Sequence, residues 1–271
     1  VLTRLGMEFS ILRNVAVLFH DRDFKGLGES AVAAIATCLA MSIPTGGVIW
    51  LSSDVLSDLV YGKPEVAVIL RWTALAIPLL ALTGLISEIL KGLDRPFMGT
   101  LVQTTLMPLV NCTVLVGVWY FGHVSAATGS IGVVAGAGVA VLVGSWVWLS
   151  CSGQTADLAG RLSIDRVKTY LREAPSLLSV TMTGIIMHWI GSMILGVTAS
   201  SADVGGFTTA MRSSIGISLL LASASTVVSR RFAVLNHTND IDSLRDVSQR
   251  LSLVLTATSA PFIVILLFFP R

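Results

Sequence analysis

Charged residues are scarce in this chain. Only 13% of its 271 residues are Asp, Glu, Lys or Arg, against about 25% in soluble globular proteins. A soluble domain of this length would need a much larger charged surface, so the shortage excludes that class. The apolar residues form long uninterrupted runs and do not alternate with polar ones, which excludes an outer-membrane β-barrel. The composition therefore predicts an all-α polytopic membrane protein.

Residues that perform chemistry are scarce too. The three cysteines, Cys38, Cys112 and Cys151, have neither disulfide nor metal spacing, and we interpret them as small packing residues. The chain has no Gly-Lys-Ser/Thr phosphate loop. Its predicted outer loops are short and lack the catalytic constellation of a membrane polymerase or acyltransferase. We expect no enzyme activity, no metal, no cofactor and no nucleic-acid partner.

The apolar runs predict about eight transmembrane helices. Seven are long enough to cross the bilayer; they cover residues 27–51, 65–91, 97–121, 127–150, 174–198, 204–229 and 247–269. The stretch 1–19 is apolar but contains Arg4, Glu8 and Arg13. We interpret it as the remainder of a helix that begins before residue 1.

Basic residues are concentrated on one side of these spans. The connections at 20–26, 91–96, 151–173 and 230–246, with their flanking turns, hold thirteen Lys and Arg residues, and the opposite side holds three. Because basic loops stay in the cytoplasm, the first set is predicted to be cytoplasmic. The expected location is the plasma membrane, with the bilayer itself as the main partner.

Two segments of the chain resemble each other. "RNVAVLFHDRDFKGL" (13–27) and "RRFAVLNHTNDIDSL" (230–244) agree at seven of fifteen positions at an offset of 217, and this offset also places Pro44 on Pro261. Six spans separate equivalent points, so both copies leave the membrane on the cytoplasmic side. We interpret this as a parallel six-helix repeat that forms two lobes.

The repeat predicts three regions. Residues 1–150 are the first lobe, incomplete at its N-terminus, and residues 174–271 are the start of a second lobe, incomplete at its C-terminus. Residues 151–173 would be a cytoplasmic linker that forms a hinge or a short surface helix. On this interpretation the chain is a fragment of a protein with twelve or more spans.

Four motifs resemble the polysaccharide and lipid-linked oligosaccharide flippases of the multidrug/oligosaccharidyl-lipid/polysaccharide exporter superfamily. They are "GMEFSILRNVA" (6–16), "KGLDRPFMGTLVQTTLMPLVN" (91–111), "ILGVTASSADVGGFTTAMR" (194–212) and "RRFAVLNHTNDIDSL" (230–244). The resemblance implies a bilobed transporter, monomeric and driven by H⁺ or Na⁺, that moves a lipid-diphosphate-linked glycan to the outer leaflet by alternating access. The segment that overlaps the third motif departs from many relatives. They carry an acidic residue before the Ile-Leu-Gly of the seventh helix, whereas "MHWIGSMILG" (187–196) has none.

A diphosphate substrate requires cationic side chains in a cavity. We predict Arg4, Arg212, Glu8 and Arg13 as substrate-binding residues. Arg4 can instead form an i,i+4 salt bridge with Glu8, Arg212 can reach the outer surface, and Arg13 can anchor the cytoplasmic end of its helix. His188 is the candidate for ion coupling, or else a neutral core histidine.

The alternative function is a multidrug and toxin extrusion type exporter of small organic cations. It would require acidic cavity residues, and the chain offers Arg there instead. Other polar and small residues have structural interpretations: Glu88 and Lys91 form a surface pair, Asp94 and Arg95 make a turn, and Gly132 and Gly136 allow close helix packing.

Overall fold

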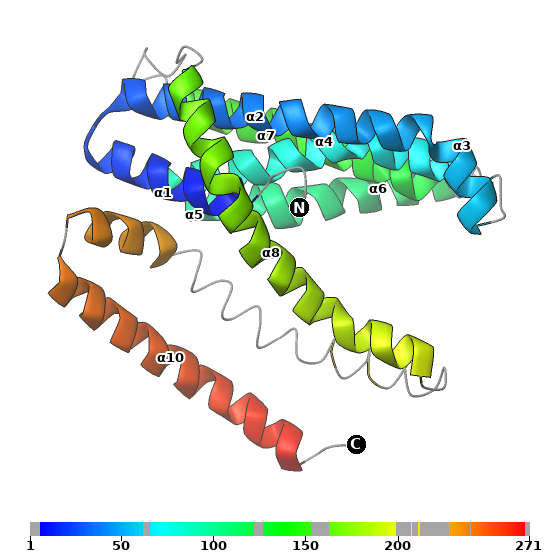
Figure 1. Ribbon diagram of the computed structural model, residues 1–271. Coiled ribbons are helices and arrows are strands. Elements are labelled where there is room, and N and C mark those ends of the chain that lie inside the picture. The colour runs from blue at the N-terminus through cyan, green and yellow to red at the C-terminus, as the bar shows by residue number, and fades with distance from the viewer. Residues whose placement is uncertain are drawn as a thin grey trace. The chain divides into compact units, whose positions relative to one another are not determined.

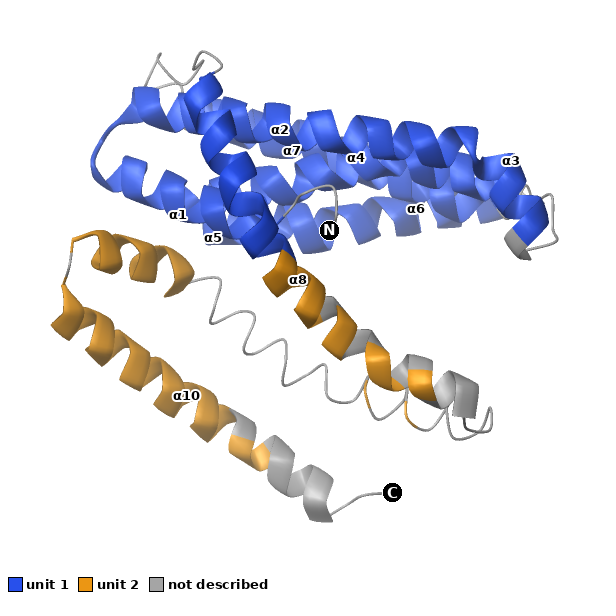
Figure 2. Cartoon of the chain, in the orientation of Figure 1, with its two compact units in different colours: residues 1–178 blue, residues 179–271 orange. Residues whose placement is uncertain are grey.

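The computed structural model describes residues 6–61, 65–121, 127–152, 163–198, 207, 211, 228–238 and 240–268. These residues form helices and turns, with no strand among them. The chain divides into two compact units, Val1–Leu178 and Ser179–Arg271 (Figure 2). The predicted all-α polytopic fold class is confirmed.

The first unit contains a bundle of long helices. In chain order its elements are α1 (Met7–His20), α2 (Phe24–Leu51), α3 (Ser53–Leu56), η2 (Ser57–Tyr61), α4 (Glu65–Gly92), α5 (Pro96–Thr100), η3 (Leu101–Leu106), α6 (Met107–Tyr120), α7 (Thr128–Ser152) and the first turns of α8 (Ile164–Thr198). η2 and η3 are π-helical. In Figure 1, α2, α4, α6 and α7 run side by side, with α4 in contact with both α2 and α7.

Four stretches of the described chain are long and apolar enough to cross a membrane. They are Phe24–Leu51, Val66–Gly92, Pro96–Tyr120 and Thr128–Ser150. Each agrees within a few residues with a predicted span. The third is built from α5, η3 and α6, which follow one another without a break.

The turns between these helices have identifiable chemical causes. Asp94 adopts a left-handed conformation, with φ of 67°, and Arg95 is the N-cap residue of α5. Pro96 is the first helical residue, where its missing N–H costs nothing and its fixed φ suits a helix. The prediction that Asp94 and Arg95 form a turn is confirmed.

Aliphatic and small residues form the main core of the first unit. Ile11, Leu27, Leu85 and Ile89 are fully buried there. Cys38 is buried in the same cluster, as its interpretation as a packing residue requires. Cys112 is exposed on α6, so that interpretation was wrong for Cys112, whose helix turns this side chain away from its neighbours. The side chain of Cys151 lies outside the described residues.

Glycines let α7 approach α6 closely. A Cβ atom on Gly136 would lie 2.7 Å from the carbonyl oxygen of Met107, and one on Gly132 would overlap the side chain of Asn111. By contrast, a Cβ on Gly138 would meet nothing within 4 Å. The predicted close packing at Gly132 and Gly136 is confirmed, and it is confined to one face of α7.

The second unit contains the rest of α8, a helical segment at 228–237 and α10 (Ile241–Phe268). Predicted span 174–198 coincides with the C-terminal part of α8, and 247–269 lies within α10 except for its last residue. Predicted span 204–229 falls almost wholly outside the described residues. α8 is one continuous helix that begins at Ile164, inside the predicted linker, so the lobe boundaries stay predictions.

The two copies of the sequence repeat form the same local structure. α1 ends at His20 and α2 begins at Phe24, while the second copy is helical to His237 and α10 begins at Ile241. These positions differ by the offset of 217. Pro44 lies inside α2 and Pro261 inside α10.

The hydrogen bonds of the two turns also correspond. The Asp23 carboxylate accepts a bond from the Gly26 N–H at 2.9 Å, and the Asp240 carboxylate accepts one from the Ser243 N–H at 3.1 Å. The Asp23 N–H donates to the Leu18 carbonyl, as the Asp240 N–H does to that of Leu235. An Asp at the N-cap satisfies an otherwise unpaired N–H of the first helical turn. This agreement supports the interpretation of the two segments as one repeated unit.

The cap at Asp240 predicts a pH dependence of the start of α10. Hydrogen bonding to the Ser243 side chain and N–H lowers the pKa of Asp240 below its ordinary value. A group with a lowered folded pKa contributes stability that is complete above its unfolded pKa and disappears as pH falls through the folded value. We therefore expect the Ser243 amide to lose hydrogen-exchange protection in acid. Asp240→Asn, which caps without titrating, should remove the pH dependence, and persistence of the dependence in that variant would contradict the assignment.

Candidate functional site

The structure describes two of the five predicted site residues in atomic detail. Glu8 lies in the first turn of α1 and Arg13 at its middle. Arg4 and Arg212 lie outside the described residues, as does the side chain of His188, whose backbone belongs to α8. The predicted roles of all five stay predictions.

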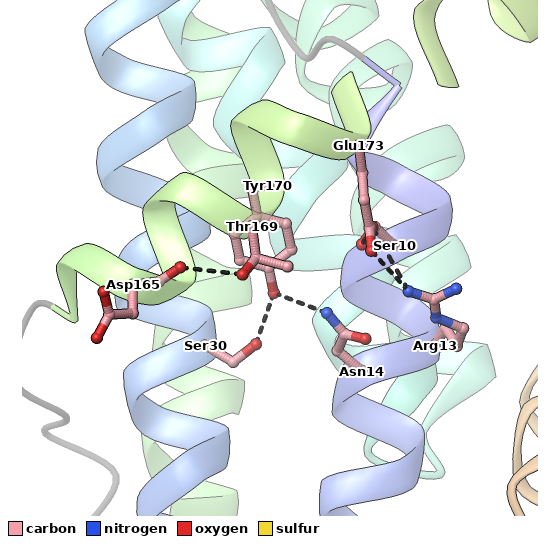
Figure 3. A network of polar contacts seen from close by, with 8 residues as sticks. All are labelled: Ser10, Arg13, Asn14, Ser30, Asp165, Thr169, Tyr170 and Glu173. Carbon is pink, nitrogen blue, oxygen red and sulfur yellow. Dashed lines mark hydrogen bonds and ion pairs between the residues drawn. The ribbon is translucent and has the colours of Figure 1, made fainter. Parts of the chain in front are cut away.

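Arg13 pairs with a carboxylate from α8. Its Nη2 atom lies 3.2 Å from Oε1 and 3.4 Å from Oε2 of Glu173, and the Ser10 hydroxyl donates to Oε2 at 2.6 Å (Figure 3). The Arg13 side chain is 54% exposed and that of Glu173 33% exposed. Both side chains are therefore partly exposed, and an exposed ion pair contributes little stability, about 1 kcal/mol or less.

Tyr170 anchors the same part of α8. It is 2% exposed and belongs to the main core cluster. Its hydroxyl lies 2.6 Å from that of Ser30 on α2, and Asn14 on α1 donates a longer bond to it at 3.4 Å (Figure 3). Burial raises the pKa of Tyr170 above its ordinary value, despite the hydrogen bonds, which lower it. The phenol therefore stays neutral and is a suitable core residue.

The contacts of α8 follow one face of the helix. Arg166, Tyr170, Glu173 and Leu177 recur every three or four residues, which is the spacing of one helical face. Arg166 approaches Glu29 of α2 at 4.0 Å, and a Cβ on Gly6 would lie 2.6 Å from the Leu177 backbone. We call the contact of residues 164–178 with α1 and α2 the α8 seam.

Gly6 makes the closest approach of the seam possible. Its φ of 70° is in the left-handed region, where a side chain is disfavoured. The absence of a Cβ also leaves room for the backbone of Leu177. Both features explain why glycine occupies the position before α1.

A second polar cluster lies between α4 and the π-helix η3. Lys91 donates to Glu88 at 2.6 Å and to the side-chain oxygen of Gln103 at 3.0 Å, and the Ser87 hydroxyl also donates to Gln103 at 3.0 Å. The side chains of Lys91 and Glu88 are only 10% and 13% exposed. The predicted pair forms, but its placement on the surface was wrong, because η3 covers it.

Comparison with known families gives a match in the N-terminal part of the chain. Residues 5–117 match the MatE family model. The match covers 113 of the 271 residues and supports a transporter of the multidrug/oligosaccharidyl-lipid/polysaccharide exporter superfamily. It does not separate glycan flippases from drug exporters. No curated protein and no solved structure matches the chain.

The matched segment, residues 5–117, contains α1, α2, α4 and most of α6, whereas α7 and α8 follow it. The α8 seam therefore joins residues inside the match, such as Ser10 and Arg13, to residues beyond it. The match and the four candidate spans of the described residues together indicate a multi-pass membrane transporter. In the part of the chain that the structure describes, no group of three His, Cys, Asp or Glu residues is placed to hold a metal.

The second unit has an open pocket on α10. It measures about 470 Å³ and is lined by Ser248, Gln249, Ser252 and Leu253. None of these four side chains carries a charge, so the pocket offers no group that would bind an ion.

The sequence did not indicate Tyr170 or Glu173 as important. Both lie in the stretch predicted as a linker, where charges dominate. The available signal was the spacing of Val167, Tyr170 and Ala174, which places three apolar residues on one helical face. Val167 packs against the core and Ala174 is 5% exposed.

Proposed function

We propose that the protein moves lipid-linked oligosaccharide or polysaccharide precursors from the cytoplasmic to the outer leaflet of the plasma membrane by alternating access. The match to MatE supports a transporter of this superfamily. The predicted arginine side chains of its spans are positively charged, which favours an anionic substrate. An ion gradient of H⁺ or Na⁺ would supply the energy, with His188 as the candidate coupling residue.

The observation that carries this proposal is the pairing of the carboxylates in the candidate spans. Glu29 and Glu88 are the acidic residues of those four spans. Glu88 is 2.6 Å from Lys91, and Glu29 is 4.0 Å from Arg166. Carboxylates already matched by basic side chains are poor sites for an organic cation, whereas Arg13 is half exposed at the predicted cytoplasmic end.

The alternative is export of small organic cations, which the MatE match equally allows. It predicts that transport depends on acidic residues within the spans. A cell that carries the complete protein distinguishes the two functions, because surface glycan display and efflux of a cationic dye can be measured in parallel.

Replacement of Arg4 and of Arg212 by Ala tests the glycan proposal. Each removes a guanidinium that is predicted to bind the diphosphate, and a hydrogen bond to a charged group contributes about 1.5–3 kcal/mol. We expect each variant to lower the rate of glycan display about tenfold or more, with cationic dye efflux unchanged.

Arg250→Ala is the matched control. This side chain is 77% exposed and pairs with Asp246 on the same helix, so its loss should leave display unchanged. Normal display in both the Arg4 and the Arg212 variants, at equal protein levels, would remove the proposed role of these arginines.

A further inference from the structure

A carboxylate of α8 occupies the position at which an anion would meet α1. Glu173 accepts hydrogen bonds from both Ser10 and Arg13, and these two donors lie three residues apart on one face of α1. We propose that Ser10 and Arg13 form a phosphate-binding site in which Glu173 is an internal competitor, and that a phosphate-bearing head group displaces Glu173 and loosens the α8 seam. The inference rests on the proposed function for the identity of its ligand.

The geometry of the pair leaves room for exchange. Both contacts to Glu173 come from one nitrogen of Arg13, at 3.2 and 3.4 Å. Charge-assisted N–H···O bonds are usually about 2.7–2.9 Å, and a guanidinium can offer two parallel N–H groups to one anion. The Arg13–Glu173 pair has neither the short distance nor two parallel N–H donors. A phosphate group could use both, because its oxygens match the planar fork of arginine.

The exposure of the site fits a ligand that arrives from water or from the head-group layer. Arg13 is 54% exposed, whereas the neighbouring anchor Tyr170 is 2% exposed. An anion can therefore reach the guanidinium without opening the core. Lys91, by comparison, is 10% exposed and is bonded to Glu88 and Gln103, so it offers no comparable access.

Displacement of Glu173 would change how the first turns of α8 are held against α1. Glu173 lies one turn after Tyr170 and one turn before Leu177, between the buried anchor and the close contact with Gly6. Release of its carboxylate removes the charged contacts with α1 and leaves the Tyr170 anchor in place. Binding of an anion at α1 would then change the mobility of the seam.

The experiment uses the full chain in phosphatidylcholine nanodiscs, with Cys38, Cys112 and Cys151 replaced by Ser. Spin labels on Phe9→Cys and Thr169→Cys, two exposed positions on α1 and α8, report the α1–α8 distance. One arm adds inorganic diphosphate to the solution. The other incorporates a polyprenyl diphosphate into the nanodisc. The two arms distinguish a free phosphate from a lipid head group.

We expect the polyprenyl diphosphate to broaden the distance distribution, and to do so at a lower concentration than inorganic diphosphate. Glu173→Gln keeps an acceptor for Ser10 but removes the competing charge, so it should raise the affinity for either anion about fivefold, the factor that a partly exposed ion pair provides. Arg13→Gln should abolish the response. Glu29→Gln, the same change at the Arg166 contact, should leave the affinity unaltered.

A purely structural role for Glu173 gives a different result. In that case Glu173→Gln would loosen the seam without any change in anion affinity, and this outcome would overturn the proposal, as would a full response in Arg13→Gln. Failure of the proposed function alone has its own signature. The anion responses would then remain as expected, while removal of the protein from cells would leave glycan display unchanged.

Discussion

Tyr170→Ala is expected to detach the first turns of α8 from the bundle. Tyr170 is a large and fully covered side chain of the main core cluster, although it comes from the edge of the first unit. Truncation of a buried aromatic residue to Ala costs about 3–5 kcal/mol, because the lost contacts leave a cavity. The weak ion pair of Arg13 cannot offset a loss of this size.

Cys38 provides a direct measurement of this change. Its thiol is fully buried in the same core cluster as Tyr170, so it should react with a maleimide only when the cluster opens. Cys112 and Cys151 are replaced by Ser, because Cys112 is exposed and would react in every state. We expect Tyr170→Ala to raise the labelling rate of Cys38 by at least a hundredfold at equal temperature, in proportion to the loss of stability.

Two further variants separate the contributions of Tyr170. Tyr170→Phe keeps the ring and removes the hydroxyl that meets Ser30 at 2.6 Å, which should cost about 1 kcal/mol. Leu171→Ala shortens the next side chain, which is 41% exposed, and should leave labelling unchanged. Equal labelling rates in Tyr170→Ala and Leu171→Ala would show that the seam does not depend on Tyr170.

The spans could be predicted because the bilayer imposes a long apolar run on each helix. α2 and α4 were located to within three residues by this criterion alone. The turn at Asp94–Pro96 could also be predicted, because proline and the residue before it have strong preferences for particular backbone conformations. These features depend only on residues that are adjacent in the sequence, so one sequence is enough to predict them.

The α8 seam could not be predicted in the same way. Ser10 and Glu173 are 163 residues apart, and no local sequence pattern predicts which distant helix a charged segment will contact. The Glu88–Lys91 pair shows the same limit on a smaller scale. Its spacing predicted the contact, but its burial follows from η3, where Gln103 completes the cluster. Local spacing indicates which side chains can pair, while tertiary packing decides their exposure.

Gly136→Ala is expected to lower the stability of the protein, and Gly138→Ala to preserve or raise it. The two glycines lie two residues apart on α7. A Cβ at 136 would stand 2.7 Å from the Met107 carbonyl oxygen, whereas a Cβ at 138 would meet nothing within 4 Å. The obstacle at 136 is backbone, which cannot rotate away as a flexible side chain can. Overpacking of this kind costs about 1–3 kcal/mol.

The substitution at 138 isolates the intrinsic effect of alanine in a helix. Ala is favoured over Gly by about 1 kcal/mol in a helix interior, and the open space at 138 allows this gain. Thermal unfolding of the two purified variants should therefore bracket the original protein, with Gly136→Ala below it and Gly138→Ala at or above it. Gly136→Val should fall further still. A stability of Gly136→Ala equal to that of Gly138→Ala would mean that α6 and α7 do not pack through this face, and the small residues of α7 would then need another partner.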